Sequence, residues 1–456
     1  MIRLFQTAAL FLPVFGAHAG VSFTNLFAFN GTNGYSPAAE LAQAIDGNFY
    51  GTTGSGGSNN MGTVFRITTN GALTTLYSFG QVQDGQGNPI DGGWPMSALA
   101  QDSDGSFYGT TSGGGSNNCG TVFKITTNGA LTTLHSFKGS SEGYEPMVGL
   151  AQGSDCNFYG VTEMGGTNGY GTLFKIMTNG TFALLHTFAG TDGLNPYTAG
   201  LVCGLDGNLY GATIGGGTNG GVGTVFEITT NGALATLHTF TGHGDGANPK
   251  AGVVQGSDGS LYGTTQSGGS NNLGTVFRIT TNGTLTYLAS FNRGNGAYPM
   301  ARLVQATDGN FYGTTLAGGT NGDGTVFRIT PGGTLTSLYS FTSGSSTFFG
   351  GLVQGSDGSF YGMLPYGAGS VFRLTVVPPA APAFLSITQT NDMLTLTWST
   401  EPQATYQVQY CADLCASDWM NLGDCITATG AMLSVTDSVT NSAGRLYRVA
   451  LLPSNP

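Results

Sequence analysis

Three glutamates stand where a carboxylate pair could cleave a glycosidic bond. Glu142 and Glu145 lie in the connection that leads into one repeated unit, and Glu163 begins a loop of that unit where other units carry uncharged residues such as Ser, Leu or Ile. The chain has six glutamates in total. Because most glycosidases use two carboxyl groups that flank the scissile bond, Glu145 and Glu163 are the candidate catalytic pair of a carbohydrate-active hydrolase or lyase. An acidic, solvated rim explains the same residues without catalysis, and we favour this alternative.

Aromatic residues with polar tips recur in the Gly-x-x-Pro connections between units. Binding residues accumulate in loops on rigid scaffolds, and a Tyr or Trp ring suits the apolar C–H face of a sugar while its polar tip reaches the hydroxyl groups. Trp94 lies in the longest connection, which runs from Gly80 to Pro95. The candidate ligand-binding residues are Tyr35, Trp94, Tyr144, Glu145, Tyr197 and Tyr298. The alternative that they pack loop against loop stays open.

Two recurring sets of metal-binding residue types are present, and neither is expected to converge on an ion. His135, His186 and His238 occupy the same outer position in successive units, and equivalent outer positions lie far apart. Each Asp-Gly-type turn is explained by an Asx turn, whereas calcium needs six to eight converging oxygens. The turn aspartates are Asp46, Asp104, Asp155, Asp206, Asp258, Asp308 and Asp357. We therefore expect no metal and no other cofactor.

The first 19 residues predict an export signal. Arg3 supplies a positive start, residues 4–15 are mostly apolar, and Ala17-His18-Ala19 forms a small-x-small cleavage pattern. We expect a secreted or cell-surface protein after cleavage near Ala19.

The net charge and hydropathy of the chain limit the classes of partner that it is expected to bind. Residues 20–456 carry 12 basic and 24 acidic residues, a net charge of −12. Nucleic-acid binding depends on Lys and Arg that neutralise phosphates, so it is not expected. Outside the export signal, no stretch approaches 18 uninterrupted apolar residues, so membrane insertion is not expected either. We expect a monomer.

A segment that ends in Tyr-Gly occurs seven times, and each copy precedes a second segment of the type Gly-Thr-Val-Phe-Arg-Ile-Thr. Neighbouring copies lie 49 to 58 residues apart, a period typical of solenoids, propellers and arrays. The unit at residues 302–341 contains four strand-like runs separated by Gly-rich turns, which predicts one four-stranded blade. The turns between the first two and the last two strands are tight. The loops between the second and third strands, together with the connections between units, form the opposite surface, called here the long-loop face.

Strand counting predicts how the ring closes. The seventh unit lacks a fourth strand, and the chain runs from Thr375 into Pro378-Pro379 instead. The missing copy stands at the start of the chain, where Phe23 to Phe29 precede the first unit. Such a displaced strand would complete the last blade and remove two sheet edges. We therefore expect an all-β fold in which residues 20–376 form a seven-bladed β-propeller of four-stranded blades, closed by an N-terminal velcro strand.

The repeat resembles the GloVer tandem repeats of exported bacterial proteins. The resemblance rests on Gly-Ser-Asp-Gly-Ser-Phe-Tyr-Gly at 355–362 and Gly-Thr-Val-Phe-Arg-Ile-Thr-Thr-Asn-Gly at 274–283, and it spans about residues 21–376. It implies a surface or secreted location and no particular activity. Such proteins often end in a hydrophobic helix followed by basic residues, whereas residues 451–456 of this chain read Leu-Leu-Pro-Ser-Asn-Pro, so an anchor of that kind is not expected.

A second domain is expected after a Pro-rich linker at residues 377–383. Strand-like runs between residues 384 and 456, with Trp398 in an alternating run before Tyr406 to Tyr410, resemble the B and C strands of fibronectin type III domains and predict a small β-sandwich. Cys411, Cys415 and Cys425 cluster there, and export would permit one disulfide among them.

The leading hypothesis is therefore a secreted recognition or structural protein without enzymatic activity, which binds carbohydrate or another surface polymer through the long-loop face.

Overall fold

The computed structural model describes residues 20–37, 39–196, 200–342, 350–377, 382–400, 405–411, 419–438 and 445–452. The chain divides into two compact units, one of which is Phe23–Thr375 and the other of which contains the residues from Val376 onward. Among the described residues, no helix combines the length and hydropathy that a membrane crossing requires.

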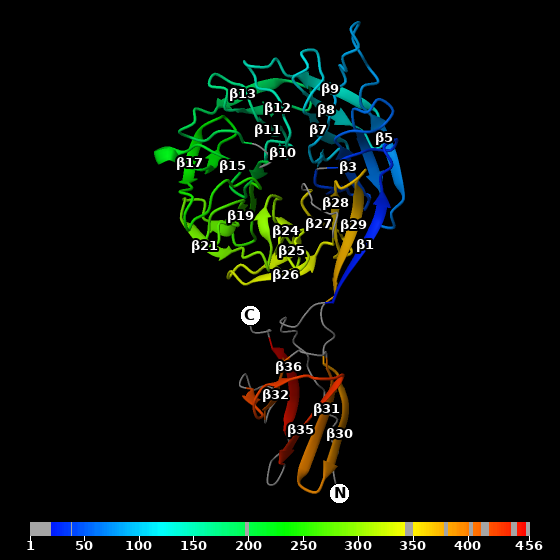
Figure 1. The fold of residues 1–456 in the computed structure, drawn as a ribbon, viewed down its shortest axis with the longest axis vertical. Helices are drawn as coiled ribbons and strands as arrows, with labels where there is room; N and C mark the ends of the chain where they lie inside the picture. The colour runs from blue at the N-terminus through cyan, green and yellow to red at the C-terminus, as the bar shows by residue number, and fades with distance from the viewer. Residues whose placement is uncertain are drawn as a thin grey trace. The chain divides into compact units, whose positions relative to one another are not determined.

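Antiparallel sheets built from consecutive strands make up the first unit, and within its described residues there are seven of them. Figure 1 shows them following one another around a common centre, with short strands such as β10 and β27 nearest to it. The first three sheets contain β2 (Ala42–Gln43), β3 (Phe49–Thr53), β4 (Thr63–Ile67) and β5 (Leu73–Ser78); β6 (Ala100–Gln101), β7 (Phe107–Thr111), β8 (Thr121–Ile125) and β9 (Leu131–Ser136); and β10 (Ala151–Gln152), β11 (Phe158–Thr162), β12 (Thr172–Ile176) and β13 (Phe182–Thr187).

The next three sheets repeat this order with small variations. They contain β14 (Val202–Cys203), β15 (Leu209–Thr213), β16 (Thr224–Ile228) and β17 (Leu234–Thr239), with the short 3₁₀ helix η1 (Thr218–Gly220); β18 (Val253–Gln255), β19 (Leu261–Thr265), β20 (Thr275–Ile279) and β21 (Leu285–Ser290); and β22 (Ala297–Pro299), β23 (Val304–Gln305), β24 (Phe311–Ala317), β25 (Thr325–Ile329) and β26 (Leu335–Ser340).

The last sheet of this unit joins the two ends of the repeat region. Its strand order is β1 (Gly20–Ala28), β29 (Ser370–Val377), β28 (Phe360–Leu364) and β27 (Val353–Gln354). β1 therefore occupies the place that the fourth strand takes in the other sheets. Phe29, which follows β1, packs edge-on against Phe65 of the first repeat at a centroid distance of 5.3 Å.

The recurring Tyr-Gly pair has a packing explanation. In every repeat, a Cβ added to this glycine would lie 2.5–2.7 Å from the ring of the third-strand Phe, so only glycine lets that ring lie across the second strand. The tyrosine beside it is buried and packs against the next repeat: Tyr50 contacts Phe107 with tilted rings at 4.3 Å, and Tyr108 stacks on Phe158 at 4.1 Å. Both faces of the second strand are thus buried between neighbouring sheets.

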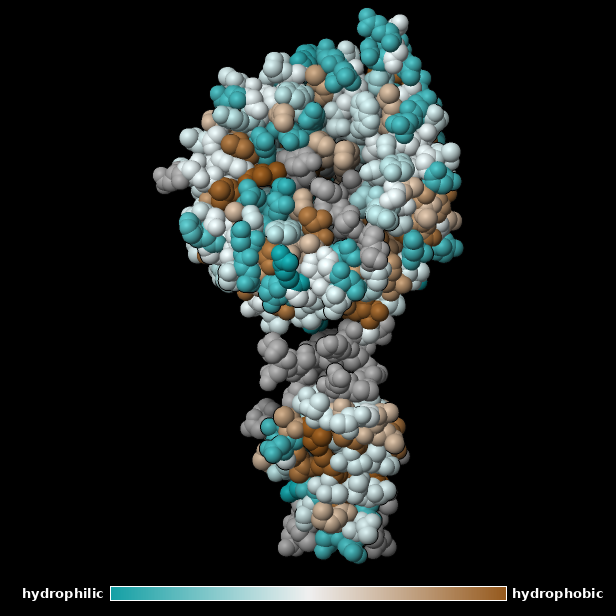
Figure 2. Space-filling model, in the orientation of Figure 1, coloured by the Kyte–Doolittle hydropathy of each residue, from teal (hydrophilic) through white to brown (hydrophobic). Residues whose placement is uncertain are grey.

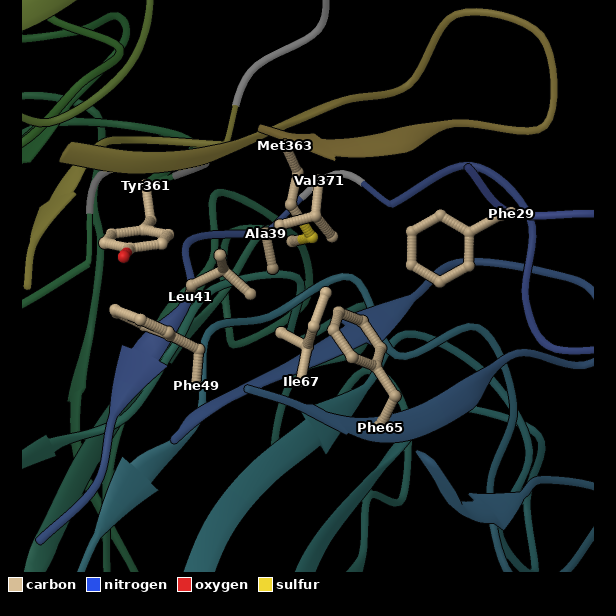
Figure 3. Close-up of a cluster of buried hydrophobic side chains, with 9 residues drawn as sticks. All are labelled: Phe29, Ala39, Leu41, Phe49, Phe65, Ile67, Tyr361, Met363 and Val371. Atoms are coloured by element: carbon tan, nitrogen blue, oxygen red, sulfur yellow. The ribbon is translucent and has the colours of Figure 1, made fainter. Parts of the chain in front are cut away.

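The same packing joins the last repeat to the first. The ring centroids of Tyr361 and Phe49 are 4.1 Å apart. The two rings belong to a cluster of buried side chains drawn from both ends of the repeat region (Figure 3). The other members of this cluster are Phe29, Ala39, Leu41, Phe65, Ile67, Met363 and Val371.

The second unit contains two sheets around one core. One sheet has the order β30 (Phe384–Thr390), β31 (Met393–Ser399) and β35 (Met432–Ser438); the other pairs β32 (Thr405–Cys411) with β33 (Met420–Asn421), β34 (Ile426–Thr427) and β36 (Leu446–Leu452). Trp398 is fully buried in this core. Cys411 is buried and Cys425 is exposed, while Cys415 and most of the expected linker lie outside the described residues, so the disulfide stays a prediction.

The surface of the repeat unit is mostly polar although few of its residues are charged. On the face that Figure 2 shows, hydrophobic residues lie singly or in small groups among polar ones.

Candidate functional site

Each Gly-x-x-Pro connection between repeats contains one strained residue next to its proline. The residue before the proline of each Gly-x-x-Pro element adopts a positive φ, which is uncommon for residues other than glycine and marks stored strain. The six angles are 54° at Ser36, 57° at Trp94, 58° at Glu145, 51° at Asn195, 56° at Asn248 and 57° at Tyr298.

Hydrogen bonds to two repeats hold these residues in place. The N–H of Trp94 donates to the carbonyl of Met61 in the preceding repeat (2.8 Å), and the carbonyl of Trp94 accepts from Ser112 in the following one (3.1 Å). Asn195 and Asn248 make the same pair of bonds. The strained residue therefore bridges two sheets, and its backbone has a structural role in every connection.

The connections between repeats and the loops between second and third strands, which were expected to share the long-loop face, lie next to each other. Isolated bridges link the connections to the loops between second and third strands: Tyr35 with Ser55, Gly93 with Gly113, Tyr144 with Met164, Leu194 with Gly215 and Ala247 with Ser267.

Several predicted ligand-binding residues pack against neighbouring loops or against the core. A Cβ added to Gly113 would lie 2.7 Å from the Trp94 ring, so the indole rests on the Gly113 backbone and is 38% exposed. The Tyr144 hydroxyl contacts the sulfur of Met164 at 3.4 Å, and Tyr298 packs against the core beside β24 and β25. Tyr197 lies outside the described residues.

Glu145 and Glu163 are neighbours in the structure. The N–H of Glu163 donates to the carbonyl of Glu145 (3.2 Å). Burial and, second to it, the negative charge of Glu145 raise the pKa of the Glu163 carboxyl above its usual value. Glu142 is not part of this pair, because its carboxylate contacts His135 at 3.0 Å and Lys138 at 2.9 Å.

A cavity of about 780 Å³ lies among the residues that precede the innermost strands. Small or apolar side chains form much of its wall, including Met96, Met147 and Met300. Tyr35 and Tyr366 also line it and are 45% and 62% exposed. This volume lies within the range of small-molecule sites, which combine apolar walls with a few polar groups. Of the candidate residues from the sequence, Tyr35 alone among those that the structure describes lines this cavity.

The charged groups of the cavity are Glu40, Lys250 and Arg302. Nη2 of Arg302 donates to Oε2 of Glu40 at 3.2 Å, and both side chains are partly exposed. The two residues occupy the same position relative to the innermost strands of the first and sixth repeats. Gly351 holds that position in the seventh repeat, where a Cβ would lie 2.2 Å from Oε1 of Glu40.

Sequence reasoning missed these three residues for an identifiable reason. The candidate residues were predicted mainly from polar-tipped aromatic side chains in the Gly-x-x-Pro connections, whereas most of the cavity lining lies between the proline and the innermost strand. A useful signal was present: in the other repeats Ala or Gly stands where Glu40 and Arg302 stand.

The histidines and turn aspartates have local partners. His135, His186 and His238 each pair with an acid of the following connection: Glu142 at 3.0 Å, Asp192 at 2.8 Å and Asp245 at 3.2 Å. The predicted Asx turns are confirmed, since one carboxylate oxygen of each turn aspartate accepts the N–H two residues on. In six repeats the other oxygen accepts the hydroxyl of the Tyr-Gly tyrosine, a bond that the sequence interpretation missed. Over the described ranges, no group of three metal-ligating side chains converges.

Solved structures of low sequence identity resemble this chain. The extracellular domain of a hybrid two-component system from B. thetaiotaomicron is 11% identical with a TM-score of 0.48, over 94% of this chain and 57% of that one. A gluconolactonase from Xanthomonas campestris is 11% identical with a TM-score of 0.41, over 82% of this chain and 100% of that one. A puromycin hydrolase is 12% identical with a TM-score of 0.48, over 81% of this chain and 60% of that one. At these TM-scores the likeness carries no functional argument.

Comparison with curated proteins gives no match. The family model described as the Gloeobacter/Verrucomicrobia repeat matches residues 14–174 and 147–376, which together cover most of the chain. The chain belongs to the Gloeobacter/Verrucomicrobia repeat family.

Proposed function

We propose that this protein is an exported, non-enzymatic recognition protein, whose repeat region is a closed seven-bladed β-propeller that binds carbohydrate at its cavity. The observation that carries the proposal is the cavity itself, where two half-exposed tyrosines meet an ion pair and apolar walls. A β-sandwich of fibronectin type III type would follow the propeller as an appendage. Export rests on the signal-like residues 1–19, which lie outside the described residues.

Contacts between the last and first repeats support closure, because they copy the contacts between consecutive repeats. The side-chain carbonyl of Gln43 accepts the N–H of Ser356 at 2.9 Å, as Gln305 accepts that of Ser257 at 2.8 Å. The stacking of Tyr361 on Phe49 repeats that of Tyr50 on Phe107. These matching contacts are what a closed ring requires, and they support the proposed closure.

The chemistry of the cavity supports a sugar ligand. A sugar ring has apolar faces that suit Tyr35 and Tyr366, and its hydroxyl edge suits the phenol groups and the charged side chains. Tyr366 lies in the β28–β29 loop, so it belongs to the same long-loop face as Tyr35. Rigid aromatic side chains with polar tips give contact area at low entropic cost.

A glycan array with the protein lacking residues 1–19 tests this proposal. Tyr35→Ala and Tyr366→Ala should each abolish or strongly weaken every glycan signal. Tyr287→Ala is the matched control, because Tyr287 is similarly exposed (46%) but does not line the cavity. Glycan signals that respond equally to all three variants, or no signal for any glycan, would count against a sugar-binding cavity.

A second candidate function, glycoside cleavage, is favoured by one observation. A general acid needs a raised pKa, and Glu163 has one beside a second carboxylate. Its test is the release of reducing ends from bound polysaccharide, compared between the natural protein and Glu163→Gln. Release that depends on Glu163 would establish catalysis, and binding without release would leave recognition as the function.

A further inference from the structure

The cationic side chains of the repeat unit are unevenly distributed. Six of them lie on third strands beside the Tyr-Gly tyrosines: Arg66, Lys124, Lys175, Arg278, Arg328 and Arg373. Two of them pair with a turn aspartate of their own repeat, Lys124 with Asp104 at 2.7 Å and Lys175 with Asp155 at 2.6 Å. The remaining cations of the repeat unit are Lys138, Lys250, Arg293 and Arg302. Two of these four, Lys250 and Arg302, line the cavity.

The lining of the cavity has more basic than acidic side chains, although the protein as a whole is acidic. The charged side chains that line the cavity are Glu40, Lys250 and Arg302. Their charges add up to a net positive charge, whereas the chain has a net charge of −11. A recessed site lined by one excess sign of charge concentrates ligands of the opposite sign.

The guanidinium of Arg302 has more hydrogen-bond donors than its contact with Glu40 uses. Its guanidinium carries five N–H groups in a planar fork that matches a carboxylate. Within the described part of the chain, its side chain makes one hydrogen bond, to Glu40. Glu40 thus holds the guanidinium at the cavity wall while leaving most of its donors available.

We propose that the cavity binds an acidic sugar, a hexuronic acid unit of a polysaccharide, whose carboxylate pairs with Arg302 while its ring lies against Tyr35 and Tyr366. This inference rests on the proposed carbohydrate-binding function and specifies its ligand. Lys250 adds a second cation to the same cavity. Glu40 competes with the ligand carboxylate for Arg302, so it sets the affinity and rejects weakly bound anions.

Calorimetric titration with uronic-acid oligosaccharides, with neutral oligosaccharides of equal length and with acetate tests the inference. The uronic-acid oligosaccharide should bind at least tenfold more tightly than the neutral one, and its affinity should fall as salt rises. Arg302→Gln should remove this preference, whereas Glu40→Gln should strengthen uronate binding. Arg293→Gln removes the same charge from an exposed loop position off the cavity and should leave binding unchanged. Melting curves of all variants verify folding.

The outcomes separate this inference from the proposed function. Equal binding of neutral and acidic oligosaccharides, lost in Tyr366→Ala but kept in Arg302→Gln, overturns the acid specificity and leaves sugar recognition standing. Binding of acetate as tight as that of the oligosaccharide shows an anion site with no sugar contact, which overturns both. Binding of no probe at all also overturns both.

Discussion

The guanidinium of Arg302 lies 3.2 Å from the carboxylate of Glu40, although 262 residues separate them in the chain. The contact joins the first and sixth repeats across the seventh, where Gly351 leaves room for the carboxylate. β1 also pairs with β29 of the last repeat, so two separate contacts join the start of the repeat region to its end. This joining of the two ends also creates the cavity, so the fold and the candidate site depend on one geometry.

Gly351→Ala should push the Glu40 carboxylate away from Arg302. The added Cβ would lie 2.2 Å from Oε1 of Glu40, and Gly351 has no positive φ that would strain alanine. A partly exposed ion pair contributes about 0–1 kcal/mol, so the melting temperature should change little. Uronate affinity, measured by calorimetry, should rise as in Glu40→Gln. A fall in affinity would show that the methyl group obstructs the ligand and that Glu40 does not compete with it.

Deletion of residues 21–30 should expose the β29 edge. β1 is the neighbour of β29 in the last sheet, and unpaired edges promote association. We expect aggregation and a large drop in melting temperature. Differential scanning calorimetry measures the melting temperature, and size-exclusion chromatography measures aggregation. A synthetic peptide of residues 20–30 should restore the melting temperature. A truncated protein that stays monomeric and melts unchanged contradicts the closing role of β1.

His135→Tyr should make stability less sensitive to acid. Burial holds the pKa of the His135 imidazole below its usual 6.5, and this effect outweighs the attraction of Glu142. The unfolded chain therefore binds more protons than the folded chain once the pH falls below about 6.5, so the stabilisation present above that pH is lost in acid. Tyrosine does not titrate there, and Tyr77 already makes the equivalent bond to Asp91 at 2.7 Å.

Melting temperatures between pH 7 and pH 5 measure this effect. The melting temperature should fall less steeply with falling pH in His135→Tyr than in the natural protein. The control His243→Tyr, at an exposed position, should leave this pH dependence unchanged. Equal slopes in all three proteins would exclude His135 as a source of acid sensitivity.

Trp94→Ala should destabilise the protein without changing sugar affinity. The indole rests on Gly113 and does not line the cavity, so its truncation removes apolar contacts worth about 1–3 kcal/mol. Chemical denaturation and calorimetric titration measure the two effects. Unchanged stability with weakened glycan binding would instead identify Trp94 as a sugar platform on the rim.

The sequence predicted most of the strands because the repeat copies them. The alternating run Met393–Ser399 forms a strand with the same bounds. β24 and β25 each start one residue after the strand-like runs that begin at Asn310 and Gly324. Two-residue strands such as β33 and β34 were missed because so short a run carries no alternation. The Tyr-Gly pattern was visible, but its cause, the close approach of the Phe ring to glycine, depends on the neighbouring strand.

The candidate site was harder to predict than the fold. Tyr35 was found because a polar-tipped aromatic in a connection is a local signal. Glu40 and Arg302 each look like isolated surface charges in the sequence, and only the return of the chain to its first repeat pairs them. The binding role of Trp94 and Tyr298 stays a prediction, since sequence cannot distinguish an aromatic that faces solvent from one that packs against a neighbouring loop or the core.

A crystal structure of the protein with a uronic-acid trisaccharide tests most directly whether the cavity binds an acidic sugar. We expect electron density for the sugar in the cavity, with one carboxylate within hydrogen-bond distance of Arg302 and a ring against Tyr35 or Tyr366. Density for the sugar beside Trp94 or between Glu145 and Glu163, with the cavity unchanged, would contradict it.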